Sequence, residues 1–145
     1  MPKIQRSAIV SHTPAQMFEL VNDFVRYPEF LPWCSTARVL EQSEDMIVGE
    51  LVIRKGSIEQ SFATRNLLTA PRRIDLTLVD GPFKSLAGHW SFKAIGDSSC
   101  QVSLELDFEF SGRIISMAIG AVFSQIIGSL VDSFSDRADK LYGTS

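Results

Sequence analysis

Residues 102–110, VSLELDFEF, alternate apolar and polar side chains, and a short Ser-Gly break then leads into one long helical segment, Arg113 to Tyr142. Strict alternation predicts a β-strand with one buried and one solvated face. From Ile114 to Val131 the helical segment carries no charged residue. This helix therefore has more apolar surface than one packing stripe needs, and the surplus must contact protein, a membrane or an apolar ligand.

The bulk composition restricts the class of protein. The chain has 145 residues, 45% hydrophobic content and a net charge of −3, which predict a single domain with a real core. The negative charge argues against DNA as a partner. Cys34 and Cys100 are too far apart to form a metal or redox motif. The first residues lack an apolar signal segment, so we expect a cytoplasmic protein, with a peripheral place at the inner membrane as an alternative.

The remaining chain reads as one strand, two short helices and six strands before the long helix. Thr13 and Gln16 form a capping-box pattern around Pro14, which favours a helix start there. The second helical turn, 23–27, should be stopped by Pro28. The strands are expected near residues 4–10, 37–41, 46–54, 57–68, 74–79, 86–93 and 100–110. Short links between them indicate an antiparallel meander, and so an α+β fold with helices on one side of a curved antiparallel sheet.

The long helix has an inner stripe at about 100° per residue. Its members are Ile119, Phe123, Ile126, Ile127, Leu130, Phe134 and Leu141. The outer stripe of the second half is charged, with Asp132, Asp136, Asp139 and Lys140. In the first half the outer positions hold Ile114, Ala118, Ala121 and Val122, followed by Gln125 and Ser129. Three interpretations stay open: a transmembrane span, a plain core helix, or a helix that walls an apolar cavity.

Two further segments are unusually apolar for loops. The stretch from Tyr27 to Cys34, YPEFLPWC, contains two prolines and cannot be regular helix or central strand. The stretch from Leu78 to Leu86 carries Phe83 beside a Gly-Pro break. Each segment either folds back into the core or borders a binding site.

Residues for enzymatic chemistry are sparse. His12 and His89 are the only histidines, and neither has a partner at metal-ligand spacing. There is no glycine-rich phosphate loop or nucleophile motif. Thr64 and Asn66 share a strand face with Phe62, where they could either hydrogen-bond a quinone carbonyl or face solvent. No general acid or base can be named, so an enzyme is not favoured.

These same segments carry a family resemblance that covers about residues 4–142. YPEFLPWC, LVDGPFK (78–84), GHWSF (88–92) and DFEF (107–110) resemble the coenzyme-Q-binding START-domain family, often described as polyketide cyclase/dehydrase-like. The resemblance implies a helix-grip, START-like fold over residues 1–145, in which a curved antiparallel sheet wraps around the long C-terminal helix.

The resemblance also implies a function, with two alternatives. The main prediction is a protein that binds ubiquinone or a related polyprenyl lipid and supports respiratory electron transfer or quinone biosynthesis, with ubiquinone as bound ligand and no catalytic cofactor or metal. The alternative is a toxin that binds the large ribosomal subunit and blocks subunit joining; a small-molecule cyclase is third. A membrane surface is a further expected partner. The expected ligand-binding residues are Phe30, Leu31, Trp33, Phe62, Phe83, Leu86, Trp90, Phe92, Phe108, Phe123, Ile127 and Leu130.

Overall fold

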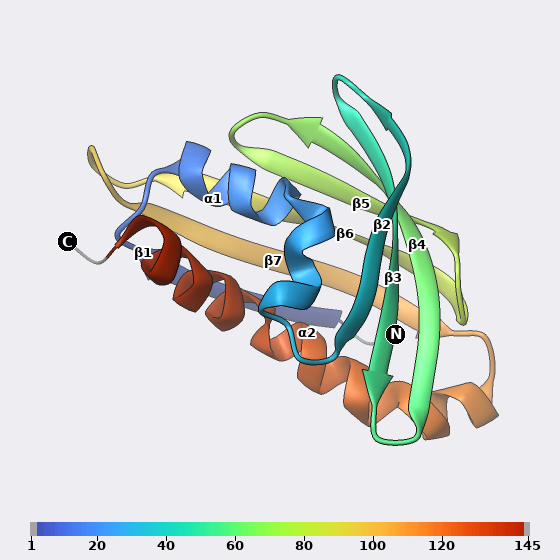
Figure 1. The fold of residues 1–145 in the computed structure, drawn as a ribbon. Coiled ribbons are helices and arrows are strands. Elements are labelled where there is room, and N and C mark those ends of the chain that lie inside the picture. Colours follow the sequence, from blue (N-terminus) through green and yellow to red (C-terminus); the bar gives the residue numbers. More distant parts are fainter. Residues whose placement is uncertain (1–2, 144–145) are drawn as a thin grey trace.

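The computed structural model describes residues 3–143, and in them one seven-stranded antiparallel sheet curves around helices on its concave side (Figure 1). The strand order is β1-β7-β6-β5-β4-β3-β2, so every neighbouring pair except β1 and β7 is consecutive in the chain. The elements are β1 (Lys3–Val10), α1 (Pro14–Asn22), the 3₁₀-helix η1 (Phe24–Glu29), β2 (Cys34–Ser43), β3 (Met46–Lys55), β4 (Ile58–Thr69), β5 (Arg73–Asp80), β6 (Phe83–Ala94), β7 (Cys100–Phe110) and α2 (Arg113–Tyr142). The α+β helix-grip fold is therefore confirmed.

Helix α1 begins as its sequence predicts. The Thr13 side chain accepts a hydrogen bond from the Gln16 backbone, the Gln16 side chain accepts one from the Thr13 backbone, and Pro14 occupies the first turn. This capping box satisfies two backbone donors that the first turn would otherwise leave free. The expected end of η1 is wrong, because Pro28 lies inside it. A short 3₁₀-helix forms few hydrogen bonds, so a missing N–H disturbs it less than it would an α-helix.

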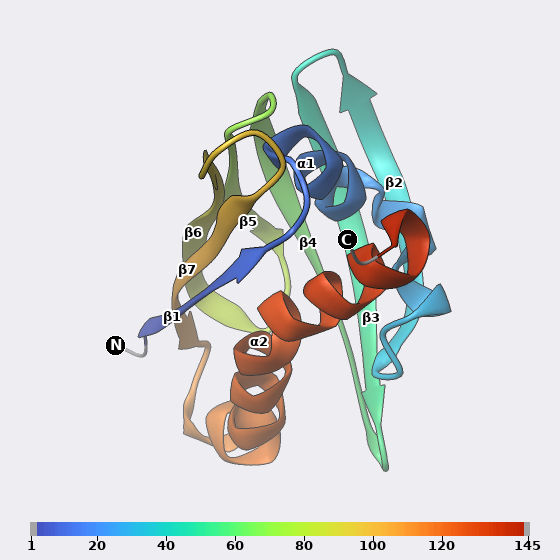
Figure 2. The same ribbon diagram turned by 90° about the vertical axis from the view of Figure 1, so that its left-hand side faces the viewer.

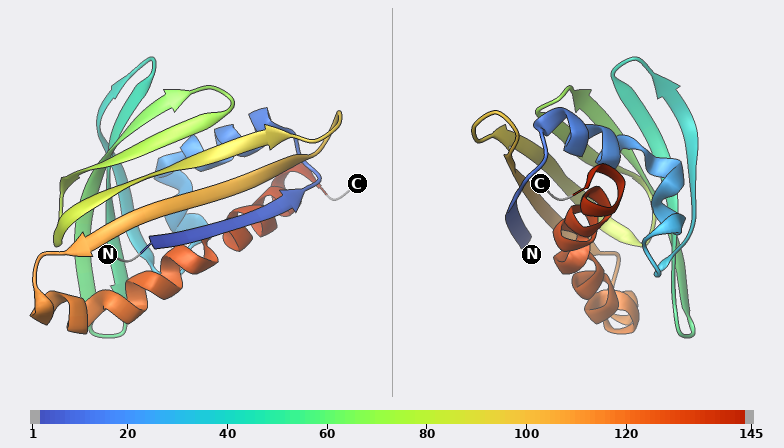
Figure 3. Two further views of the ribbon diagram at one scale, coloured as in Figure 1. Left: turned by 180° about the vertical axis from the view of Figure 1, so that it is seen from behind. Right: turned by 60° about the vertical axis from the view of Figure 1, so that its left-hand side comes forward.

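The concave side of the sheet holds all three helices. Figure 2 shows α1 and α2 inside the curve of the sheet, and the views in Figure 3 show α2 running beside β1 and past the β3–β4 hairpin. The first half of α2 lies near the turn that joins β3 to β4. Lys55 Nζ, at the end of β3, lies 3.4 Å from Gln125 Oε1 of α2. The rest of α2 crosses under β1 and α1.

Two phenylalanines of α2 join the helix to the sheet. Phe123 packs against Phe62, Phe83, Phe108 and Phe110 with ring centroids 4.9–6.1 Å apart. Eleven residues further along, Phe134 is fully buried and meets Tyr27, Phe30 and Trp90. Large aromatic side chains bury the most apolar area per residue, so these two clusters dominate the helix–sheet contact.

Some predicted boundaries and positions are wrong. Strand β6 begins at Phe83 rather than Leu86, and β2 begins at Cys34 rather than Ala37, because ladder pairing extends both beyond their alternating cores. Leu141, expected on the inner stripe of α2, is 51% exposed. In the last turn of α2, Tyr142 makes the contacts with α1 and the loop before it, and Val131 and Ala138 complete the buried stripe in place of Leu141.

Gly88 lies where β6 and β7 approach closely, and it gives a test of the fold. A Cβ added at Gly88 would stand 2.1 Å from the Glu105 carbonyl oxygen. We expect Gly88→Ala to lower the free energy of unfolding by about 3 kcal/mol, since the sheet must separate to admit the methyl group. Urea unfolding measures this, with Ser91→Ala on the same strand as the control. A loss below about 1 kcal/mol for Gly88→Ala would contradict the described register.

Candidate functional site

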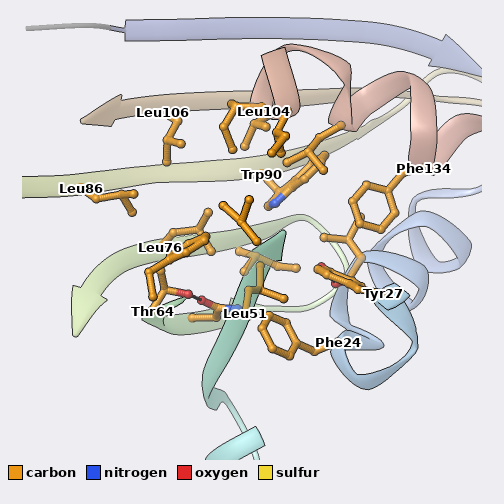
Figure 4. A pocket seen from close by; sticks show the side chains of 18 of the residues that line it. Phe24, Tyr27, Leu51, Thr64, Leu76, Leu86, Trp90, Leu104, Leu106 and Phe134 are labelled. Carbon is orange, nitrogen blue, oxygen red and sulfur yellow. Dashed lines mark hydrogen bonds between the residues drawn. The ribbon is translucent and has the colours of Figure 1, made fainter. Parts of the chain in front are cut away.

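The candidate site is a cavity between the concave face of the sheet, η1 and the middle of α2. Its volume is about 70 Å³. Figure 4 shows its walls: Thr64, Leu76, Leu86, Trp90 and Leu104 point inward from the strands, and Tyr27 and Phe134 close one end. The full lining is Val21, Phe24, Tyr27, Trp33, Leu51, Ile53, Phe62, Thr64, Asn66, Ile74, Leu76, Leu86, Trp90, Leu104, Leu106, Phe123, Ile126, Ile127, Leu130 and Phe134.

The cavity wall is uncharged. None of the lining residues is an Asp, Glu, Lys, Arg or His. Tyr27 is the one lining residue with an acidic hydroxyl; it donates a hydrogen bond to the Val21 carbonyl oxygen, and burial raises the pKa of Tyr27 well above its usual value. A charged ligand would lose its hydration here without gaining a counter-charge, so the walls favour a neutral, mostly apolar molecule.

One polar pair interrupts the apolar wall. Thr64 and Asn66 lie on the inner face of β4 and are 8% and 9% exposed. The Thr64 hydroxyl donates to Asn66 Oδ1 over 2.8 Å. The sequence left open whether these side chains face solvent or a ligand, and the structure places both against the cavity. Such a pair is a costly feature of a purely structural core, since burying polar groups without full hydrogen bonding is unfavourable.

The cavity is small. A volume of about 70 Å³ has room for roughly five water molecules. Typical small-molecule pockets measure about 300–1,000 Å³. A long polyprenyl chain therefore needs more space than this conformation offers, and its binding requires the walls to move apart.

The predicted ligand-binding residues fall into two groups. The cavity is lined by Trp33, Phe62, Leu86, Trp90, Phe123, Ile127 and Leu130. The others, Phe30, Leu31, Phe83, Phe92 and Phe108, pack in or against the surrounding core. Phe83 was expected at a cavity mouth, yet it is buried and stacks on Phe110 with centroids 5.1 Å apart. The binding role of all twelve stays a prediction.

The cavity wall formed by β3, β5 and β7 was not predicted from the sequence. Leu51, Ile53, Ile74, Leu76, Leu104 and Leu106 line the cavity from β3, β5 and β7. Their alternation signalled an inward face, but it does not distinguish a strand position over a void from one over a packed side chain. Phe24 was also missed: its ring lies over Gly49, where an added Cβ would stand 2.7 Å away.

A second feature lies on the opposite side of α2. Ile114 and Met117 are 83% and 86% exposed, and Ala118 and Ala121 beside them are also exposed. These four residues, at helical spacing, form what we call the outer apolar face. An 18-residue window of α2 has a mean hydropathy of 2.0, long and apolar enough to span a membrane, and only 28% of that window is buried. The inner stripe of the same helix is packed on the sheet, which a free transmembrane span would not allow.

The expected outward position of Val122 is wrong. Val122 is half-buried and packs toward Ile53 and Ile58 of the β3–β4 hairpin, because the hairpin reaches over that flank of α2. Met117, which was not among the predicted outer residues, occupies the outer apolar face in its place. Apolar residues are usually buried, so the sequence alone does not indicate that Met117 is exposed.

Groups for acid–base or metal chemistry do not converge at either feature. Within residues 3–143 there is no cluster of three or more His, Cys, Asp or Glu side chains able to hold a metal ion. The buried ring of His12 contacts Asp139 Oδ1 at 2.8 Å, which joins the loop after β1 to the end of α2.

On the convex face of the sheet, the hydrogen bond from Lys3 holds the pKa of Glu105 below its usual value.

Comparisons with known proteins agree with this geometry. A family model described as polyketide cyclase/dehydrase and lipid transport matches residues 10–135. The ribosome association toxin RatA of Pseudomonas aeruginosa is 46% identical over 140 residues, covering 97% of each chain. That of Vibrio cholerae is 46% identical over 143 residues, covering 99% of each. The mitochondrial coenzyme Q-binding protein COQ10 of Dictyostelium discoideum is 26% identical, covering 90% of this chain and 65% of its own.

Solved structures share the fold. The Zhui aromatase/cyclase from Streptomyces sp. R1128 superposes with a TM-score of 0.85 at 15% identity, covering 99% of both chains. The 18 kDa protein CC1736 from Caulobacter crescentus has a TM-score of 0.77 at 29% identity, covering 99% of this chain and 100% of its own.

Two buried thiols of the core give a pH-dependent test. Burial raises the pKa of Cys34 and of Cys100 to about 11, from an ordinary 9.0. A pKa raised on folding stabilises the folded state below pH 9, and this contribution is lost as the pH rises toward 11. We expect the free energy of unfolding to fall between pH 9 and 11, and to fall less in a Cys34→Ala/Cys100→Ala variant. Urea titrations at several pH values measure it; equal slopes for both proteins would contradict the buried placement.

Proposed function

The chain belongs to the polyketide cyclase/dehydrase and lipid transport family of START-like fold, and from this premise we propose that it is a ribosome-associating member of that family. The finer proposal is that it binds the large ribosomal subunit and interferes with subunit joining. It acts by binding rather than by catalysis and works in the cytoplasm, where ribosomes are.

One observation carries this proposal. Relatives named ribosome association toxins are 46% identical to this chain over 97–99% of both lengths. The relative named for coenzyme Q binding is 26% identical and longer. The cyclase of the same fold is only 15% identical, which supports a shared fold and no shared chemistry. The ribosome alternative therefore fits the comparisons better than the ubiquinone prediction.

The outer apolar face supplies a docking surface for this role. It lies on a long rigid helix, and Ile114 and Met117 project almost fully into solvent. Cations border it: Arg113 precedes Ile114, and Lys55 contacts Gln125 one turn beyond Ala121. Lys84 lies near Arg113 across a shallow surface hollow, where it pairs with Glu109 at 3.7 Å. An apolar centre with a basic rim suits a surface of ribosomal protein and RNA.

The overall charge adds a restriction. The net charge is −3, and several arginines and lysines are paired with carboxylates, such as Arg38 with Glu50 and Arg54 with Glu59. RNA affinity from phosphate neutralisation grows with the number of free cations. Association should therefore depend on salt only weakly, and apolar contacts should supply a large part of the affinity.

Co-sedimentation with purified large ribosomal subunits tests the proposal. We expect Met117→Asp to reduce the bound fraction at least about tenfold, because the new charge must be desolvated within the interface. The side chain is 86% exposed, so the variant should keep its fold, which circular dichroism checks. Ile9→Asp is the matched control, since Ile9 is 71% exposed on β1, away from this face.

Two results would count against the proposal. Absence of the unchanged protein from the subunit pellet at both low and physiological salt would remove the ribosome function. Equal losses for Met117→Asp and Ile9→Asp would leave ribosome association standing but remove the outer apolar face as its surface.

A second candidate function has its own supporting observation. The uncharged cavity with its buried polar pair suits a quinone ring, and a relative is named for coenzyme Q binding. Under this proposal the ring lies in the cavity and an isoprenoid tail leaves it past Trp33.

Organic extraction of the purified protein, followed by mass spectrometry, tests this second function. We expect close to one quinone per protein, and a several-fold lower content in Leu130→Asp, where a charge replaces an apolar wall residue that is only partly buried. Thermal unfolding of that variant checks its fold, and Ile9→Asp, on the surface of β1, is the control. An extract without quinone, together with no uptake on incubation with ubiquinone, would exclude it.

A further inference from the structure

Met117 carries the most accessible thioether sulfur within residues 3–143. It is 86% exposed, whereas Met17 is 0% exposed and Met46, the first residue of β3, is half-buried. Oxidation of a sulfur-containing side chain follows exposure, because the oxidant must reach the sulfur atom from solution. The surface of the described chain therefore directs an oxidant to the Met117 side chain.

The two thiols of the chain do not compete with this thioether. Cys34 and Cys100 are buried, and burial raises the pKa of each thiol to about 11. The thiolate is the reactive form of cysteine, and at neutral pH it is a very small fraction of a group with such a pKa. Oxidation of sulfur in this protein therefore begins at Met117.

The position of Met117 on α2 gives its oxidation a consequence. Ile114 lies three residues before it and Ala121 four residues after it, so both are its neighbours on the helix surface. Met117 and Ile114 are the two large side chains of the outer apolar face, since the other two members are alanines. A change from apolar to polar at Met117 therefore alters this face at its centre.

We propose that Met117 is a reversible oxidation site and that its sulfoxide weakens association with the large ribosomal subunit, the second part of which rests on the proposed function. With hydrogen peroxide as the oxidant, the sulfur lone pair attacks one peroxide oxygen, so that an S–O bond forms and the O–O bond breaks. The sulfur loses two electrons, and the other oxygen leaves with both hydrogens as water. The product is methionine sulfoxide.

The sulfoxide acts on the docking surface and leaves the fold intact. Its oxygen is a hydrogen-bond acceptor, and burying it against an apolar partner surface without a donor is unfavourable. Ile119 and Phe123 are buried on the side of α2 that packs on the sheet, so the modified side chain does not reach them. Methionine sulfoxide reductase restores the thioether, with a dithiol supplying the two electrons and the oxygen leaving as water.

Peptide mass spectrometry tests the oxidation site without any ribosome. The folded protein is treated with hydrogen peroxide, and the sulfoxide content of each methionine peptide is followed over time. We expect Met117 to react at least about tenfold faster than Met17, in line with their exposure. In urea the two rates should become similar, because unfolding makes both side chains accessible.

Co-sedimentation with large ribosomal subunits tests the consequence. Peroxide is removed before the subunits are added, and the bound fraction of treated protein is divided by that of the same protein untreated. This ratio should fall several-fold for the unchanged protein and for Met46→Leu, and reductase with dithiothreitol should restore it. Met117→Leu keeps an apolar side chain of similar volume without sulfur, and its ratio should not fall.

Three results would overturn the proposal. They are equal peroxide rates for Met117 and Met17 in the folded protein, a ratio that falls equally in the unchanged protein and Met117→Leu, and a treated Met46→Leu that keeps its full association. If the untreated protein does not associate with the subunit, the proposed function fails and the regulatory step fails with it. The peptide rates still decide the oxidation site in that case, so the two failures are distinguishable.

Discussion

The contact between Phe123 of α2 and the concave face of the sheet is the constraint on which the rest of the molecule depends. Its ring meets four other phenylalanines, from β4, β6 and β7, and the sheet must curve for all of them to reach one side chain. Phe134 repeats the contact three turns later with η1 and β6. Between these two anchors the helix is held away from the sheet, and the cavity occupies that interval.

The same anchoring explains why apolar side chains in the first half of α2 stay exposed to solvent. A helix whose inner stripe is fixed by Phe123 cannot rotate to bury Ile114 and Met117, and the sheet ends before it could cover them. Further along the outer side the residues become acidic, with Asp132, Asp136 and Asp139 over β1. The outer apolar face is therefore confined to one end of the molecule, where a partner can cover it without touching the rest of the chain.

The sequence predicted the features that depend on local patterns. Alternation and turn signals located all seven strands, although β2 and β6 begin earlier than expected. The Thr13–Gln16 pair located the start of α1, and helical spacing located the inner stripe except for Leu141. It did not predict which inward residues border empty space, since a void depends on how side chains from eight helices and strands fit together. For that reason Phe83 and Trp90 were expected in the same site, yet the first completes the phenylalanine cluster and the second lines the cavity. The sequence also could not decide whether Thr64 and Asn66 are buried, because two polar residues on one strand face have the same pattern whether that face is buried or solvated.

The central claim is that the outer apolar face of α2 contacts the ribosome while its inner face serves the cavity. Site-specific photo-cross-linking tests it most directly, with a photoreactive amino acid at position 117 and, in a second protein, at position 67, where Leu67 is 48% exposed on β4. Incubated with large ribosomal subunits, the position 117 protein should form cross-links to ribosomal components and the position 67 protein should not. Cross-links from position 67 alone, or equal cross-links from both positions, would contradict the account.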